Sequence, residues 1–263
     1  MPAITLSTLN GLRESNRSFS CLTAYDATFA RLASDAGIEV LLVGDSLGMV
    51  LQGHSTTLPV TVEDIAYHTR CVARANVDSL IMADLPFMAD ASLSELLNNA
   101  AMLVRAGAQV VKMEGNGWMA EGVEALSQRG VPVCAHMGLT PQHVNAFGGY
   151  RVQGRDPDDA QRIIDDALAL EEAGAALVLL ECVPRDLAQE VRDALAIPVI
   201  GIGAGPDVDG QILVMHDVLG ATQGRVPRFV KNFLFGEASI ADAFAAYREA
   251  VISHEFPAEE HCF

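Results

Sequence analysis

Short apolar runs alternate with longer segments of helical periodicity along the whole chain. The apolar runs are rich in Val, Leu and Ile, which is typical of buried strands. The predicted strands are 19–25, 39–44, 79–84, 108–114, 131–136, 176–181 and 198–203, with an eighth within 213–220. The predicted helices are 28–37, 63–75, 93–107, 117–129, 156–174, 185–195 and 239–253.

This alternation predicts an α/β protein with a parallel sheet, because repeated strand–helix units require right-handed crossovers. A length of 263 residues suits a closed (β/α)8 TIM barrel, which typically has about 250 residues. A doubly wound open sheet is the competing architecture. The number of units and the lack of a central linker favour a single barrel domain over residues 1–263, with a short N-terminal helix and a C-terminal tail.

Four acidic residues each close an apolar run: Asp45, Asp84, Glu114 and Glu181. A carboxylate at the end of a buried strand is costly unless a metal, a cation or hydrogen bonds compensate its charge. In a parallel barrel the carboxyl ends of all strands meet at one mouth. We therefore expect the four side chains to share a pocket.

Lys112 and Glu114 are two residues apart on one predicted strand, so their side chains share a face. By itself the pair is as readily a structural ion pair as a functional one. The three other strand-end acids favour function, since clustered ionisable groups mark active sites.

Oxygen donors such as Asp45 and Asp84 suit Mg²⁺, which often uses only one or two carboxylates. No His-x-x-x-His or cysteine cluster indicates zinc. Mg²⁺ held in this way could chelate a 2-oxo acid and stabilise its enolate. Lys112 would neutralise the substrate carboxylate, and Glu181 would be the base that removes the proton next to the carbonyl.

Two further residues are weaker candidates for the site. His136 closes the strand 131–136 and could polarise a substrate oxygen, but a lone histidine at a strand end is more often structural. Ser46 follows Asp45 and could donate to the substrate carboxylate. The long loop 137–156 can be read as a lid or as a subunit contact, because it is rich in glycine.

Composition narrows the choice of partners. The formal charge of −17 makes nucleic acid an unfavourable partner, because an acidic surface repels phosphates. No apolar run reaches the roughly 18 residues of a membrane span, and no secretory signal is visible, so we expect a cytoplasmic protein. The five scattered cysteines lack a C-x-x-C pattern and suit free thiols. The stretch 201–210 fails as a dinucleotide fingerprint, because Pro206 replaces its third glycine.

Several motifs together resemble the ketopantoate hydroxymethyltransferase family. They are GDSLGMVLQG (44–53), TLPVT (57–61), ADLPFM (83–88), VKMEG (111–115), HMGLTPQ (136–142), FGGYRVQGR (147–155), LECVP (180–184), PVIGIGAG (198–205) and DGQILVMHD (209–217). The resemblance runs from about Phe19 to the C-terminal tail. Arg151 and Met137 stand where the family pattern leads us to expect lysine and leucine, which leaves the acidic positions untouched.

The resemblance implies a barrel of the phosphoenolpyruvate/pyruvate superfamily. It also implies transfer of a one-carbon unit from the co-substrate 5,10-methylenetetrahydrofolate to 2-oxoisovalerate (3-methyl-2-oxobutanoate), giving 2-dehydropantoate for pantothenate biosynthesis. It implies a large homo-oligomer, a decamer.

The resemblance also assigns roles to residues. Asp45 and Asp84 correspond to ligands of Mg²⁺, and Glu114 to a further ligand that can act through water. Asp45, Ser46, Asp84 and Lys112 correspond to the residues that hold the oxo acid, and Glu181 to the proton acceptor.

Two other classes remain as alternatives. One is a magnesium-dependent carbon–carbon lyase or mutase of the same superfamily acting on another 2-oxo acid, although no K-x-C-G-H loop is present. The other is a non-catalytic scaffold, which gives no reason for acids at four strand ends.

Overall fold

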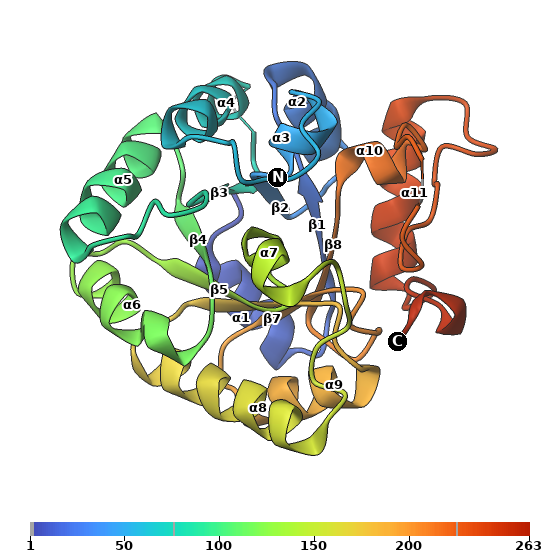
Figure 1. Cartoon of the computed structure of the whole chain (residues 1–263). Helices are drawn as coiled ribbons and strands as arrows, with labels where there is room; N and C mark the ends of the chain where they lie inside the picture. Colours follow the sequence, from blue (N-terminus) through green and yellow to red (C-terminus); the bar gives the residue numbers. More distant parts are fainter. Residues whose placement is uncertain (1–2, 76, 225) are drawn as a thin grey trace.

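Eight parallel strands close into a barrel in the computed structural model, which describes residues 3–75, 77–224 and 226–263. Each strand pairs with its sequence neighbours, and β1 pairs with β8 to complete the ring (Figure 1). The prediction of a (β/α)8 TIM barrel is confirmed. The strands are β1 (Phe19–Thr23), β2 (Val40–Val43), β3 (Leu80–Asp84), β4 (Val110–Glu114), β5 (Val133–Gly138), β6 (Leu177–Glu181), β7 (Val199–Ile202) and β8 (Gly210–Leu213).

The helices surround the strands, with α4, α5 and α6 on the left of Figure 1, α8 and α9 along its lower edge and α11 on the right. Almost every strand residue is buried, as expected for a sheet that is covered by helices outside and by side chains inside. The longer helices are α1 (Leu6–Glu14), α2 (Ala27–Asp35), α4 (Val62–Arg74), α5 (Leu93–Ala106), α6 (Ala120–Ser127), α8 (Pro157–Glu172), α9 (Arg185–Ala194) and α11 (Ile240–Ile252).

Polar caps define where several of these helices begin. Thr61 and Asp64 form a reciprocal capping box at the start of α4, and Ser92 accepts a hydrogen bond from the backbone N–H of Glu95 at the start of α5. Asp156 caps α8, with Pro157 at the first helical position. These caps set the helix starts within a residue or two of the positions that the sequence predicts.

The predicted position of the eighth strand, 213–220, is wrong. The strand is Gly210–Leu213, and the following apolar residues form the short helix α10 (Met215–Val218). Gly210 looks like part of a turn in the sequence, but it pairs with Phe19. A Cβ atom at Gly210 would lie 2.4 Å from the Phe19 ring, so only glycine fits this register.

The connection from β7 to β8 contains no helix, since residues 203–209 lead directly from one strand to the next. A dinucleotide fingerprint requires a helix after its glycines. The structure therefore agrees with the rejection of that motif.

Two predicted loops contain single turns of helix. The loop after β2 includes α3 (Leu47–Val50), and the loop after β5 includes the 3₁₀ turn η2 (Pro141–His143) and α7 (Val144–Phe147). Another 3₁₀ turn, η1 (Gly117–Met119), precedes α6, and η3 (Glu259–His261) lies in the C-terminal tail. Helices this short have no periodic pattern from which they could be predicted.

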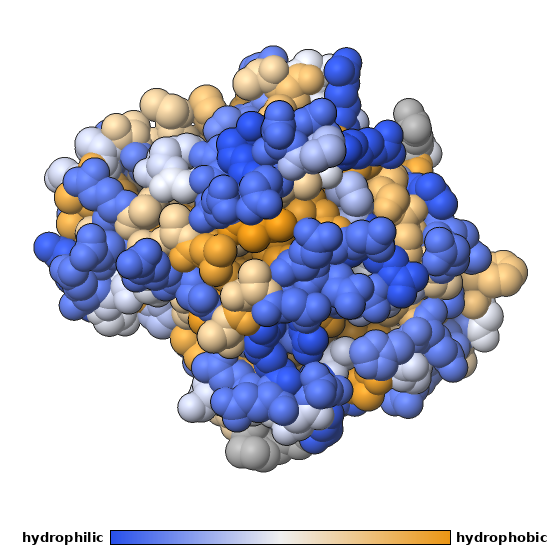
Figure 2. All heavy atoms as spheres, turned by 90° about the horizontal axis from the view of Figure 1, so that it is seen from below, coloured by the Kyte–Doolittle hydropathy of each residue, from blue (hydrophilic) through white to orange (hydrophobic). Residues whose placement is uncertain are grey.

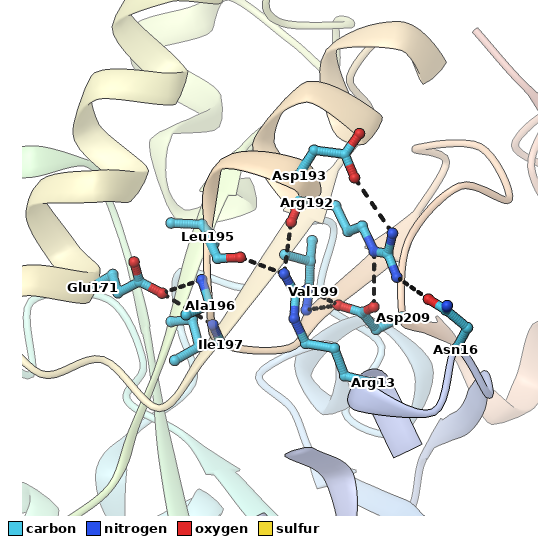
Figure 3. A network of polar contacts seen from close by, with 10 residues as sticks. All are labelled: Arg13, Asn16, Glu171, Arg192, Asp193, Leu195, Ala196, Ile197, Val199 and Asp209. Atoms are coloured by element: carbon cyan, nitrogen blue, oxygen red, sulfur yellow. Dashed lines mark hydrogen bonds and ion pairs between the residues drawn. The ribbon is translucent and has the colours of Figure 1, made fainter. Parts of the chain in front are cut away.

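A buried ionic network ties α1 to the end of the barrel at which the strands begin (Figure 3). Asp209 directly precedes β8 and accepts hydrogen bonds from Arg13 of α1, from Arg192 of α9 at 3.0 Å and from the backbone N–H of Val199 at 2.9 Å. Arg13 also donates to the backbone carbonyls of Arg192 and Leu195. The network joins α1, α9, β7 and β8 at the end away from the strand-end acids.

The face over α8 and α9, seen in Figure 2 from below Figure 1, is mainly hydrophilic, with apolar atoms in the furrows. This pattern is typical of amphipathic helices whose apolar stripe faces the core. Within the three described segments, no helix combines the length and the apolar character needed to cross a membrane.

We predict that Asp209→Ala lowers the free energy of unfolding by about 3 kcal/mol, because it leaves two arginines without their shared carboxylate. Urea unfolding measures this change. The matched control is Asp193→Ala. Asp193 is exposed and also pairs with Arg192, so its removal should lower the free energy of unfolding by less than about 1 kcal/mol. Equal losses for the two variants would contradict the structural role of Asp209.

Candidate functional site

Three of the predicted acids meet at the mouth formed by the carboxyl ends of β2, β3 and β4. One carboxylate oxygen from each of Asp45, Asp84 and Glu114 lies within 4.8 Å of the other two. The three residues are 4%, 1% and 5% exposed. Asp84 and Glu114 end their strands, whereas Asp45 follows β2 by two residues. The structure thus brings together the residues that the sequence assigns to a metal.

Lys112 lies between two of these carboxylates and is itself 3% exposed. Its Nζ lies 2.7 Å from Asp84 Oδ1 and 3.0 Å from Glu114 Oε1. The prediction that Lys112 and Glu114 share a face is confirmed, and the pairing of β3 with β4 sets Lys112 directly beside Asp84. One ammonium therefore compensates two carboxylates from neighbouring strands.

The pKa values of this cluster are shifted in opposite directions. Burial would lower the pKa of Lys112, but the charges of Asp84 and Glu114 outweigh it and raise the value, so Lys112 stays protonated. Burial would raise the pKa of Glu114, but Lys112 and His136 overcome it and hold the value below its usual range. Burial, together with the neighbouring acids, raises the pKa of Asp45 and of Asp84, although Lys112 partly opposes both shifts.

The net charge of this cluster matches a divalent cation. When all groups are ionised, the three carboxylates and Lys112 leave two negative charges in a buried volume. An all-oxygen donor set fits Mg²⁺, which needs few protein ligands and keeps several waters. Both oxygens of Glu114 already accept hydrogen bonds from the protein, which suits a contact with the ion through water.

Gln142 also belongs to this site, although no sequence pattern predicts it. It lies in the turn η2 after β5 and is 8% exposed. Its Nε2 donates to Asp45 Oδ2 and to the carbonyl of Leu85, each at 3.0 Å, and its backbone N–H donates to Glu114 Oε2 at 3.0 Å. The only signal in the sequence was its place in the HMGLTPQ motif, since a glutamine in a loop carries no chemistry of its own.

His136 lies between two glutamates, near the end of β5. Its Nδ1 is 3.2 Å from Glu114 Oε1 and its Nε2 is 3.3 Å from Glu181 Oε2, although neither contact has the alignment of a hydrogen bond. Burial and the charge of Lys112 oppose protonation of the ring, but the two glutamates outweigh them and raise the pKa of His136. His136 thus connects the candidate base to the carboxylate cluster.

Glu181 ends β6 and is the least buried of the four acids, with 17% of its side chain exposed. This partial exposure leaves it open toward the mouth of the barrel, whereas the other three acids are enclosed. A base that meets a substrate entering from solvent needs such access. This placement suits the role predicted for Glu181.

Ser46 lies beside Asp45 at the start of α3, and its hydroxyl is 2.9 Å from the hydroxyl of Tyr25. Tyr25 is 1% exposed, and burial raises its pKa, so its phenol stays protonated. Because the backbone carbonyl of Tyr25 accepts a hydrogen bond from His68 at 2.7 Å, Tyr25 is held at both ends. Ser46 therefore has a fixed partner, and its hydroxyl, with one donor and two acceptor sites, can still hydrogen-bond to a ligand.

The segment 137–156 reaches over the mouth through Tyr150. Its hydroxyl contacts the sulfur of Met49 in the β2 loop at 4.0 Å, and the charges of Glu181 and Asp45 contribute, after burial, to raising its pKa. The segment therefore contacts the loop after β2 through Tyr150 and the buried acids through Gln142. The two roles proposed for this segment, a lid and a subunit contact, both stay predictions.

A surface cavity of about 440 Å³ lies apart from the acids, beside the start of α9. Arg185, Arg228 and Glu259 contribute to its lining. Arg185 is paired with Asp207 and Glu259, and Arg228 donates to the backbone carbonyl of Glu260, so both arginines that line the cavity already have partners in the protein. We assign the chemistry to the buried acids instead.

Known proteins of one family match this chain over nearly its whole length. The family model for ketopantoate hydroxymethyltransferase matches residues 3–259. The 3-methyl-2-oxobutanoate hydroxymethyltransferase of Chromohalobacter salexigens is 67% identical over 263 residues and covers 100% of both chains. The protein of the same name from Marinobacter nauticus is 60% identical over 261 residues, covering 99% of each chain.

Solved structures with the same fold include phosphonopyruvate hydrolase in complex with oxalate and Mg²⁺, with a TM-score of 0.63, 18% identity and 83% coverage of each chain. A 2,3-dimethylmalate lyase of the PEP mutase/isocitrate lyase superfamily has a TM-score of 0.56 and 16% identity, covering 79% of this chain and 80% of its own. At these identities the likeness shows the fold alone. That fold is the (β/α)8 barrel that the sequence predicts.

We predict that Asp45→Asn makes the metal-free protein progressively more stable than the wild type as the pH rises from about 4. Because the folded-state pKa of Asp45 is raised, the wild type loses stability between the unfolded-state pKa, about 3.9, and the higher folded-state value. Asparagine does not titrate and avoids this loss. Melting temperatures in the presence of a chelator, measured across the pH range, check the prediction. A difference that is independent of pH, or that grows toward acid, would contradict it.

Proposed function

The chain belongs to the ketopantoate hydroxymethyltransferase family, and on that premise we propose that it transfers a hydroxymethyl group to 3-methyl-2-oxobutanoate, forming 2-dehydropantoate for pantothenate synthesis. The prediction of a transferase is confirmed at the level of this family. The one-carbon donor that we propose is 5,10-methylenetetrahydrofolate. The observation that carries the chemistry is the buried cluster of Asp45, Asp84 and Glu114 around Lys112, with Glu181 beside it.

Asp45 and Asp84 would hold Mg²⁺ directly, and Glu114 would hold it through water. When bound, Mg²⁺ would supply Lewis acidity toward the keto oxygen of the substrate. The donor set fits this ion because it offers only oxygen atoms in a buried site of matching charge.

Lys112 and Ser46 would position the oxo acid. The ammonium has three N–H donors, of which Asp84 and Glu114 use two, so one remains for a substrate oxygen. The hydroxyl of Ser46, held by Tyr25, can donate to the substrate carboxylate. These two donors would fix the plane of the oxo acid and so the direction of its C3–H bond.

Glu181 would take the proton from C3, and the electron pair of that C–H bond would form the enolate. C3 would then bond to the methylene carbon as one of its two C–N bonds to the folate breaks, and water would displace the second folate nitrogen to leave the hydroxyl group. The proton taken by Glu181 and the proton lost by the water would go to the two folate nitrogens, which gives tetrahydrofolate. His136 would hold Glu181, since its ring lies between Glu181 and Glu114 and its raised pKa favours a positive charge facing both. A contact between His136 and a substrate oxygen stays a prediction.

A homo-oligomer, a decamer by family resemblance, and a cytoplasmic location remain predictions. The apolar side chains around the mouth include the exposed residues Met49, Phe87, Met88 and Tyr150. These residues could contact either the folate or a second subunit. The alternative of a lyase or mutase has no support beyond the shared fold.

We predict that the purified protein forms 2-dehydropantoate from 3-methyl-2-oxobutanoate and methylenetetrahydrofolate, that EDTA abolishes this activity and that excess Mg²⁺ restores it. Mass spectrometry of the product checks the outcome, with a reaction lacking the folate as the control. Full activity in EDTA would refute the metal site. An absence of product with Mg²⁺ present would refute the proposed reaction.

We predict that Glu181→Gln slows hydrogen–deuterium exchange at C3 of 3-methyl-2-oxobutanoate by at least about 100-fold, because the amide cannot accept the proton. Binding of the oxo acid should change little, since Glu181 does not hold its oxygens. Proton NMR of the substrate in D₂O follows the exchange, and Glu172→Gln, an exposed position on α8, serves as the control. Exchange at the wild-type rate in Glu181→Gln would assign the base to another residue.

A further inference from the structure

Gln142 makes more contacts to the acidic cluster than a connecting loop requires. All three of its N–H groups are used: the two of the side-chain amide on Asp45 and on the carbonyl of Leu85, and the backbone N–H on Glu114. Each contact is 3.0 Å long. A single residue from the turn after β5 therefore bridges the ends of β2, β3 and β4.

The contacts are selective for particular oxygens. Gln142 binds Asp45 Oδ2 and Glu114 Oε2, whereas Lys112 binds the other oxygen of Glu114 and Asp84 Oδ1. In the part of the chain that the structure describes, no hydrogen bond or ion pair involves Asp45 Oδ1. The amide of Gln142 therefore leaves this one oxygen of Asp45 available to a cation.

Of the side chains that the structure describes, Gln142 alone donates a hydrogen bond to Asp45, so Asp45 depends on it. Within the described segments, Lys112 is the one lysine or arginine that pairs with these acids, and it binds Asp84 and Glu114 rather than Asp45. Three buried carboxylates so close together repel one another, and an aspartate without a donor would turn away from its neighbours. The amide of Gln142 opposes this rotation.

We propose that Gln142 is a positioning residue that orients Asp45 and Glu114 for the divalent cation, and so makes the loop after β5 a part of the metal site. This inference rests on the metal-binding role in the proposed function. Residues that hydrogen-bond to metal ligands orient them, and removing such a residue typically weakens metal binding about 10- to 100-fold. A purely structural glutamine would stabilise the loop without changing the affinity of the folded protein for metal.

The test measures Mn²⁺ binding to the wild type and to Gln142→Met by electron paramagnetic resonance, without oxo acid or folate. Methionine has nearly the length and volume of glutamine but donates no hydrogen bond. The control is Gln153→Met, in the same loop. Among the hydrogen bonds of the described residues, the side-chain amide of Gln153 donates only to the backbone carbonyl of Arg151. Thermal melts without metal identify the temperature range in which every variant is folded.

We expect Gln142→Met to weaken Mn²⁺ binding about 10- to 100-fold at a temperature at which it is folded, while Gln153→Met binds as the wild type does. Equal affinity in Gln142→Met and the wild type, or an equal loss in both variants, would overturn the proposal. If the methionine variant does not fold, Gln142→Asn shortens the side chain by one carbon and should show the same loss. A wild type that binds no Mn²⁺ would instead refute the metal site of the proposed function.

Discussion

The shared ion pairs of Lys112 hold the site together. Burying three carboxylates at the end of a barrel is prohibitive unless a positive charge lies among them. Lys112 provides that charge because β4 turns it to the same side as Glu114 and pairs it with Asp84 on β3. Since one ammonium cannot neutralise three acids, the cluster remains negative and suits a divalent cation.

One end of the barrel contains a stabilising ionic network, and the other end contains the candidate active site. At the end where the strands begin, Asp209 accepts hydrogen bonds from Arg13, from Arg192 and from a backbone N–H, so the protein itself compensates its charge. At the other end, Asp45 Oδ1 has no hydrogen-bond partner in the described part of the chain, and Lys112 keeps one N–H donor. This division follows the general rule for the fold, in which active sites form at the carboxyl ends of the strands.

The sequence predicted the barrel and most of the site because both depend on short-range patterns. An apolar run that ends in an acid is visible in the chain, and parallel strands bring such ends to one mouth. The eighth strand was misplaced because Gly210 and Gln211 interrupt its apolar pattern, and its glycine is explained only by the ring of Phe19. Gln142 was missed because its contacts depend on how the turn after β5 folds across the mouth.

The central claim is that the acids around Lys112 bind a single divalent cation. The most direct measurement is the anomalous scattering of crystals grown with Mn²⁺ in place of Mg²⁺. The account predicts one strong peak in contact with Asp45 Oδ1 and an oxygen of Asp84, with Glu114 reaching it directly or through water. No peak at this mouth, or a peak bound only by other residues, would contradict it.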